Sequence, residues 1–130
     1  MRSFHKALAL SILFSSTPAP AQFIAGRWLP SGHSDDARFY VDRLTLERRG
    51  NLVSVWTQAS YERPKPTGEI YSMSHLEIDC AARTSDLISV TDYRPDGSVV
   101  SRIVLEPSER RPAPVGTGSI AGTMLSIACR

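Results

Sequence analysis

Cysteine, histidine and long apolar runs are all scarce in this 130-residue chain. It has two cysteines and three histidines, and His33 and His75, the two outside the first 21 residues, lie far apart in the sequence. Metal sites need clustered ligands, so we expect neither a metal nor another cofactor. The longest apolar stretch, residues 7–14, is well below the roughly 20 residues that a membrane-spanning helix needs. We therefore expect no membrane anchor of this kind.

The first residues have the layout of an export signal. Arg2 and Lys6 form a basic segment without any acid, the apolar stretch follows, and a small-residue triplet, Ala19-Pro20-Ala21, comes next. We expect residues 1–21 to be a signal peptide that is cleaved, which leaves residues 22–130 as one small domain. No cysteine lies near the cleavage point, so we expect no lipid anchor. The mature protein is expected to be exported, either periplasmic or secreted.

Neither sign of charge dominates the mature domain. Of the 15 Lys and Arg residues, Arg2 and Lys6 lie in the signal segment, so 13 remain against 13 Asp and Glu. Nucleic-acid binding depends largely on the neutralisation of phosphates by basic residues. We therefore expect no nucleic-acid partner.

Short runs of β-branched and aromatic residues, separated by turn residues, predict a single antiparallel sheet of about five to six strands. The expected strands cover residues 24–29, 38–46, 52–59, 69–80, 84–93 and 98–105. Gly50 and the Pro95-Asp96-Gly97 sequence suit two of the tight turns between strands. Residues 30–36 and 61–68 are predicted to be loops because of their composition.

The periodicity changes after residue 118. Residues 110–118 contain prolines and glycines and predict a linker, whereas residues 119–129 predict a C-terminal α-helix with Ser119 as its N-cap. Its expected apolar stripe comprises Ile120, Ala121, Met124, Leu125 and Ala128. A helix this short is not stable alone, so it must pack on the sheet. The predicted fold class is α+β.

The two cysteines are placed to join this helix to the sheet. Cys80 lies on the more apolar side of the strand predicted at residues 69–80, and Cys129 lies in the last helical turn. In an exported protein a single cysteine pair is expected to be oxidised. A bond between them closes a loop of some 50 residues, which constrains the unfolded chain by about 4 kcal/mol in the entropy model.

No residue constellation predicts catalysis. Both cysteines are expected to be oxidised, and no serine follows the nucleophile-elbow pattern. Glu77 and Asp79 share one strand face, which leaves paired-carboxylate hydrolysis as a minor alternative. A simpler interpretation of Asp79 is an ion pair with Arg27 or Arg83.

Candidate binding residues fall into two groups. Six basic residues lie at predicted turns and loops: Arg48, Arg49, Arg63, Lys65, Arg110 and Arg111. If they protrude on one side, they can dock an acidic protein segment or a sulfated glycan, whereas dispersed charges would serve solubility. Trp28 and Trp56 could form an aromatic platform, but their apolar neighbours favour a place in the core.

A series of landmarks follows along the mature chain: Trp28, Val41-Asp42, Arg49-Gly50, Val55-Trp56, Ser72, Asp79-Cys80-Ala81, Arg83, Tyr93, Gly97, Pro114, Gly116, Ser119 and Cys129. In their order and spacing, these residues resemble the surface-adhesin protein E family of bacterial exported proteins. The resemblance implies a small antiparallel sheet with a C-terminal helix that a Cys80–Cys129 disulfide holds in place. It also implies a cell-surface role, binding to host matrix and serum glycoproteins, and the ability to dimerise.

The residues and the resemblance together predict an exported, non-catalytic binding protein whose ligand is a protein or a glycan. A homodimer formed through a sheet edge is a further expectation. The alternative is a soluble periplasmic envelope or assembly factor that pairs with its partners through an exposed sheet edge.

Overall fold

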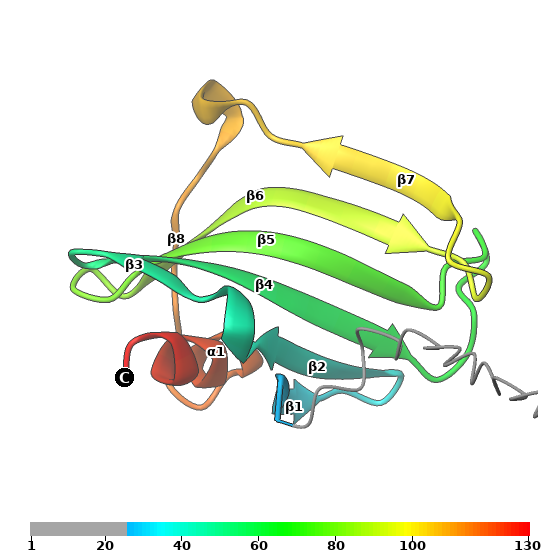
Figure 1. The fold of residues 1–130 in the computed structure, drawn as a ribbon, viewed down its shortest axis with the longest axis horizontal. Coiled ribbons are helices and arrows are strands. Elements are labelled where there is room, and N and C mark those ends of the chain that lie inside the picture. The colour runs from blue at the N-terminus through cyan, green and yellow to red at the C-terminus, as the bar shows by residue number, and fades with distance from the viewer. Residues whose placement is uncertain (1–25) are drawn as a thin grey trace, which may run out of the picture.

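The strands of residues 26–130, the part of the chain that the computed structural model describes, form one antiparallel sheet (Figure 1). The predicted signal peptide, residues 1–21, and the first two residues of the strand predicted at 24–29 lie outside the described residues. The strands are β1 (Trp28–His33), β2 (Ala37–Asp42), β3 (Glu47–Arg49), β4 (Leu52–Tyr61), β5 (Tyr71–Asp79), β6 (Thr84–Tyr93), β7 (Val99–Val104) and β8 (Ala113–Pro114). One α-helix, α1 (Ile120–Ala128), ends the chain. The predicted α+β class is confirmed.

The order of the sheet is β1-β2-β4-β5-β6-β7, with the short β3 beside β4 and the short β8 beside β6. Figure 1 shows β1 and β7 at opposite edges and α1 near the β1 edge. The turns that were expected at Gly50 and at Pro95-Asp96-Gly97 connect β3 to β4 and β6 to β7. No helix of the described residues is long and apolar enough to cross a membrane.

The hydrophobic core lies between α1 and one face of β2, β4 and β5. The sheet contributes Val41, Val53, Val55 and Ile78, each at most 1% exposed. The helix contributes four further buried residues, Met124, Leu125, Ile127 and Ala128. Because strand side chains alternate between faces, the residues next to these three valines and Ile78 point away from α1.

The helix has the expected bounds but buries a different stripe. Ser119 caps it, its Oγ accepting a hydrogen bond from the Gly122 amide at 2.9 Å. Ala121, expected in the stripe, is exposed, whereas Gly122 and Ile127 are buried. The reason is a close approach of the linker: a Cβ at Gly122 would lie 2.5 Å from the Gly116 carbonyl oxygen. A helix face that carries no side chain therefore packs against the chain that enters the helix.

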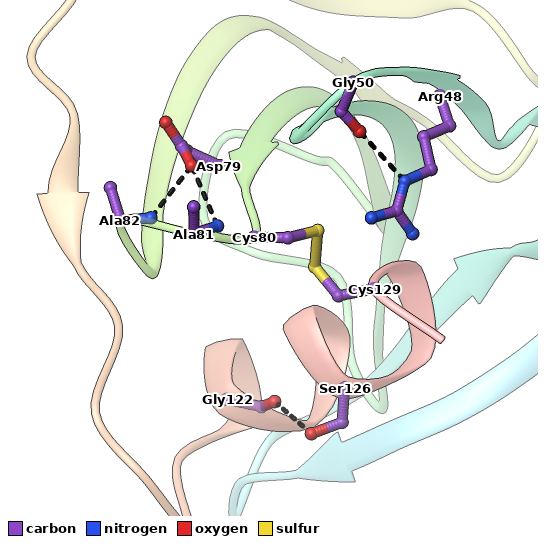
Figure 2. Close-up of a disulfide and its surroundings, with 9 residues drawn as sticks. All are labelled: Arg48, Gly50, Asp79, Cys80, Ala81, Ala82, Gly122, Ser126 and Cys129. Atoms are coloured by element: carbon purple, nitrogen blue, oxygen red, sulfur yellow. Dashed lines mark hydrogen bonds between the residues drawn. A yellow bond between two sulfur atoms is a disulfide. The ribbon is translucent and has the colours of Figure 1, made fainter.

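A disulfide between Cys80 and Cys129 joins the sheet to the last turn of α1, as expected (Figure 2). The two Cα atoms lie 5.7 Å apart, and the cysteines are 49 positions apart in the chain. Cys80 is held from the other side as well, because its amide donates to the Asn51 carbonyl at 2.8 Å. The bond thus fixes the helix to the turns at one end of the sheet.

The first strand differs from the prediction at both ends. It begins at Trp28 rather than residue 24 among the described residues, and it continues to His33 through part of the predicted loop 30–36. The register shifts between Pro30 and Gly32, which marks a bulge. Pro30 is tolerated because β1 is an edge strand and needs no amide hydrogen on its outer side. Gly32, with φ of +143°, allows Ile120 of the helix to approach closely.

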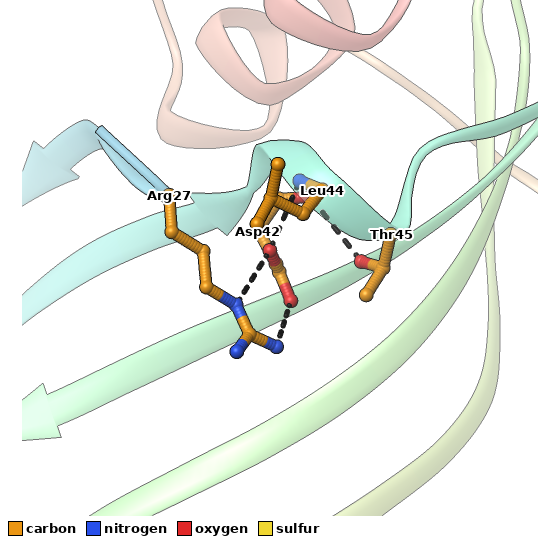
Figure 3. Close-up of polar contacts among 4 residues, drawn as sticks. All are labelled: Arg27, Asp42, Leu44 and Thr45. Carbon is orange, nitrogen blue, oxygen red and sulfur yellow. Dashed lines mark hydrogen bonds and ion pairs between the residues drawn. The ribbon is translucent and has the colours of Figure 1, made fainter. Parts of the chain in front are cut away.

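The second predicted strand, residues 38–46, is interrupted after Asp42. The Asp42 carboxylate accepts a hydrogen bond from the Leu44 amide at 3.1 Å and begins a 3-10 turn at Arg43–Thr45 (Figure 3). An aspartate that bonds to the backbone two residues on is a common turn former. The chain then resumes as β3, which pairs with β4.

Asp42 forms an ion pair with Arg27, which the sequence analysis had offered as a partner of Asp79. It is 1% exposed, and Arg27 donates to its two oxygens at 3.1 and 2.8 Å (Figure 3). The expected pairing of Asp79 with Arg27 or Arg83 is therefore wrong. The Asp79 carboxylate instead accepts the amides of Ala81 and Ala82 and shapes the turn that leads to β6 (Figure 2).

The predicted linker 110–118 contains one strand that the sequence did not indicate. Ala113 and Pro114 pair with Ser85 and Thr84 at the start of β6, and the Val115 amide donates to the Arg83 carbonyl at 2.9 Å. A two-residue strand has no periodicity to detect. Its effect is to fix the course of the chain from β7 to α1.

Removal of the disulfide by the double substitution Cys80→Ser and Cys129→Ser is expected to lower the free energy of unfolding by about 2–5 kcal/mol. Denaturant titration of the oxidised protein, the reduced protein and the variant measures this loss. The reduced protein should match the variant, because both lack the same cross-link. Equal midpoints for all three samples would show that the bond does not hold the helix.

Replacement of Gly122 by Ala is expected to destabilise the protein by about 1–3 kcal/mol, because the new methyl group collides with the Gly116 carbonyl. An ordinary Gly→Ala change inside a helix stabilises by roughly 1 kcal/mol, so the sign is diagnostic. Gly116→Ala is the matched control, since its Cβ would meet no atom closer than 4.0 Å. Thermal unfolding followed by circular dichroism measures both; a stabilised Gly122→Ala variant would contradict the packing described here.

Candidate functional site on the open face of the sheet

The face of the sheet opposite α1 carries most of the aromatic side chains of the strands. Because α1 is the one α-helix of residues 26–130, no second α-helix among these residues covers this face. We call it the open face. Its aromatic members lie on β1, β2, β4, β5 and β6: Trp28, Tyr40, Trp56, Tyr71, His75 and Tyr93.

Trp56 and His75 form the centre of the open face. They are direct cross-strand partners on β4 and β5, and their rings stack with centroids 4.6 Å apart and planes 6° from parallel. The expectation that Trp28 and Trp56 lie in the core is wrong, because both are half-buried and neither belongs to the core beneath α1. The alternation of β4 explains the placement of Trp56: Val53 and Val55 take the core side, so Trp56 points the other way.

A second aromatic pair lies towards the other end of these strands. Tyr71 and Tyr93 face one another across β5 and β6 with centroids 4.8 Å apart. Burial raises the pKa of Tyr71, and the neighbouring Tyr93 adds to the rise. Towards the β1 edge, Trp28 and Tyr40 line a shallow hollow of about 270 Å3 together with Gln58 and Ser60. The open face is thus aromatic with polar side chains between the rings.

The open face also contains a larger hollow, of about 470 Å3, at the end where β3 joins β4. We call it the charged hollow; its lining residues are Glu47, Arg49, Leu52, Ser54, His75, Glu77, Ile88 and Arg110. Two arginines predicted as binding residues, Arg49 of β3 and Arg110 of the segment before β8, thus meet at one place. Residues 47, 54, 75, 77 and 88 were not predicted as binding residues. The cross-strand alignment of Glu47, Ser54 and Glu77 could have indicated them, had the pairing been known.

His75 links the aromatic centre to the charged hollow. Its Nε2 lies 2.5 Å from the Ser54 hydroxyl, with which it shares a hydrogen bond. Burial lowers the pKa of His75 and the positive charge of Arg110 lowers it further, whereas Glu47 and Glu77 act in the opposite direction. The ring is thereby favoured in its neutral form near neutral pH.

The charges of the hollow are not paired with one another. Within residues 26–130, the ion pairs closer than 4.0 Å are Arg27–Asp42 and Lys65–Asp36, both outside the hollow. The Nε of Arg110 is buried without a hydrogen-bond partner in these residues. A buried donor without a partner is uncommon in folded proteins and points to a ligand or a water molecule.

The remaining predicted basic residues are committed elsewhere or lie apart. Arg48 donates to the Gly50 carbonyl at 3.0 Å, and Arg111 donates to the Ser108 and Arg110 carbonyls at 2.8 Å. Arg63 and Lys65 line a separate hollow of about 360 Å3 beside Asp35, Asp36 and Glu62. Lys65 lies 2.8 Å from Asp36 and holds the pKa of that carboxyl below its ordinary value. The six residues therefore do not form one patch, and their binding role stays a prediction.

The arrangement favours binding over the minor hydrolytic alternative. Asp79 uses its carboxylate to shape a turn, and Glu77 faces Asp86 across β5 and β6. Ser54 and His75 resemble the first two members of a nucleophilic triad, which also needs an acid on the second ring nitrogen. Within residues 26–130 no side chain makes a hydrogen bond to that nitrogen. In the same part of the chain no group of three or more His, Cys, Asp or Glu residues is placed to hold a metal ion.

Comparison with known protein families identifies a match for this chain. The model of a protein family described as surface-adhesin protein E matches residues 28–130, which includes every strand and the helix. Among curated proteins no relative matches the chain.

The lowered pKa of His75 has a consequence for stability. When the pH falls through the ordinary histidine value of 6.5, the unfolded chain takes up a proton at this position before the folded protein does. The free energy of unfolding is therefore expected to decrease as the pH decreases through this range. His75→Gln should make the free energy of unfolding less dependent on pH. An NMR titration of the His75 ring measures the pKa directly.

His33→Gln is the matched control for this experiment, since it removes a histidine outside the charged hollow. It is expected to retain the His75-dependent part of the slope. A His75 pKa at or above 6.5 in the folded protein would show that the ring is not desolvated as described.

Proposed function

The chain belongs to the surface-adhesin protein E family, and we propose that it is an exported, non-catalytic binding protein that contacts extracellular or envelope proteins or glycans. The observation that carries the proposal is the open face. Its aromatic side chains are half-buried, take no part in the core beneath α1 and have no α-helix over them in residues 26–130.

Aromatic side chains on a rigid sheet suit ligand contact for a physical reason. They present large amphipathic surfaces and lose little conformational entropy when a ligand binds. The stacks Trp56–His75 and Tyr71–Tyr93 hold four rings in place before any ligand arrives. Tryptophan and tyrosine are also enriched among the residues that dominate binding energy in protein interfaces. The open face is therefore the surface on which we place the ligand.

A second candidate function rests on the edge strand β7. It pairs with β6 on one side, and no other strand of residues 26–130 pairs with its outer edge. Val99, Ile103 and Val104 on this strand are 51%, 54% and 55% exposed. An unpaired edge with β-branched side chains can accept a strand from another chain. This observation supports a periplasmic envelope or assembly factor, or a homodimer, as the alternative.

The proposal predicts saturable binding to at least one member of a panel of matrix proteins and glycans. Tyr40→Ala should weaken that binding, because Tyr40 lines the hollow of the open face beside Trp28. An Ile103→Lys variant is the matched control, since a lysine on an edge strand blocks strand pairing and Ile103 pairs with Val90, on the face away from the aromatic rings.

The two candidate functions give opposite results. A binding protein of the open face loses its ligand in the Tyr40 variant, whereas an edge-pairing factor loses its partner in the β7 variant. Cell fractionation is the independent measurement: binding of extracellular ligands requires the protein at the cell exterior, whereas an envelope or assembly factor stays soluble in the periplasm. No saturable binding to any panel member, with all the protein in the periplasm, would contradict the proposed function.

A further inference from the structure

Resting on the proposed function, we propose that the charged hollow binds an acidic sugar residue, one whose ring carries a carboxylate, as a uronic acid does. The three chemical features of such a ligand are an anionic group, several hydroxyl groups and an apolar ring face. The hollow offers a complement to each.

The anionic group matches Arg49 and Arg110. Neither guanidinium makes a hydrogen bond or an ion pair with another residue of the described chain. The adjacent arginines differ: Arg48 bonds to Gly50, and Arg111 bonds to Ser108 and to the carbonyl of Arg110. A guanidinium binds a carboxylate through two parallel hydrogen bonds, which gives both affinity and orientation. Of the pairs Arg48–Arg49 and Arg110–Arg111, the hollow is thus lined by the two guanidinium groups, those of Arg49 and Arg110, that are free to bind a carboxylate.

The hydroxyl groups match Glu47, Glu77 and Ser54. The three side chains are cross-strand neighbours in one row from β3 to β5. An ionised carboxylate only accepts hydrogen bonds, so Glu47 and Glu77 need donors, which sugar hydroxyl groups supply. Neither glutamate pairs with an arginine within 4.0 Å, although Arg49 and Arg110 line the same hollow. A ligand with both acceptor and donor groups would satisfy both kinds of side chain.

The apolar face of the ring matches Leu52, Ile88 and the His75 ring. All three line the hollow, and Leu52 is 37% exposed. The stack on Trp56 holds the His75 ring in place. At about 470 Å3 the hollow lies within the range of roughly 300–1,000 Å3 that small-molecule sites occupy.

The charge balance favours a carboxylate over a heavily sulfated sugar. Two arginines face two glutamates in the hollow, and His75 is favoured in its neutral form there. Such a site tolerates one negative charge at the arginines, whereas several sulfate groups would also lie against Glu47 and Glu77. Like charges at short range are unfavourable.

The test uses three probes that differ only at carbon 6, the exocyclic carbon of the sugar: methyl glucuronide with a carboxylate, methyl glucoside with a hydroxymethyl group, and methyl glucoside 6-sulfate. Binding to the mature protein is measured by calorimetry or by NMR shifts of the His75 ring. The glucuronide should bind saturably and about tenfold or more tighter than the glucoside, as expected for hydrogen bonds to a charged group. It should also bind more tightly than the sulfate.

The variants separate the hollow from general surface charge. Arg49→Gln and Arg110→Gln should each weaken glucuronide binding by about tenfold. Arg48→Gln and Arg63→Gln remove the same charge outside the charged hollow and should leave the binding unchanged. Glucuronide binding that falls equally in all four variants would reduce the effect to nonspecific charge and overturn the proposal.

Two further outcomes would overturn it. One is the absence of saturable glucuronide binding to the unmodified protein, and the other is tighter binding of an acidic peptide than of the glucuronide. Neither outcome decides the proposed function, which is tested by the protein panel and Tyr40→Ala. Panel binding that survives in the Arg49 and Arg110 variants would retain the open face as a binding surface without the sugar site.

Discussion

The attachment of α1 to one face of the sheet is the constraint on which the rest of the molecule depends. The Cys80–Cys129 bond holds the end of the helix, and the bare surface of Gly122 lets the linker pack against its start. Four helix residues then bury the valines and Ile78 of the sheet. For a core of eight buried residues, a cross-link that contributes about 2–5 kcal/mol is a large share of the total stability. With this arrangement α1 covers one face of the sheet, and no second α-helix in residues 26–130 covers the other face.

The buried carboxylate of Asp42 connects this architecture to the charged hollow. By capping the turn at Arg43–Thr45 it ends β2 and redirects the chain into β3. That change of direction places Glu47 and Arg49 beside β4, where they form one wall of the hollow. Arg27 compensates the charge of Asp42 with two hydrogen bonds, since an unpaired buried carboxylate would be strongly unfavourable. A single local turn therefore decides which charged side chains of β3 line the charged hollow.

The sequence was sufficient for the features that follow from local chemistry and not for those that depend on pairing. The alternation of β4, the Pro95-Asp96-Gly97 turn, the Ser119 cap and the cysteine pair indicated the sheet, the helix and the disulfide correctly. The strand predicted at 38–46 ends at Asp42 instead of residue 46, because the turn that follows depends on the hydrogen bond between the Asp42 carboxylate and the backbone. The hollow was not foreseen because Arg49 and Arg110 are 61 positions apart and only the register of the sheet brings them together. Trp56 was misplaced although the alternation of Val53 and Val55 already assigned it to the opposite face.

Arg110 connects the charged hollow to the C-terminal part of the chain, because it lines the hollow and lies in the segment that leads to β8 and α1. On its N-terminal side, Arg110 follows β7 and the 3-10 turn at Pro107–Glu109. On its C-terminal side, β8 pairs with β6 and Val115 bonds to Arg83, just beyond Cys80. Figure 1 shows this segment running from the β7 side of the sheet to α1. Since the disulfide fixes the helix at the end of the same segment, the bond that stabilises the domain also limits where Arg110 can lie. Arg110 is thus held between the 3-10 turn and β8, and the segment that carries it leads into the helix that the disulfide attaches to the sheet.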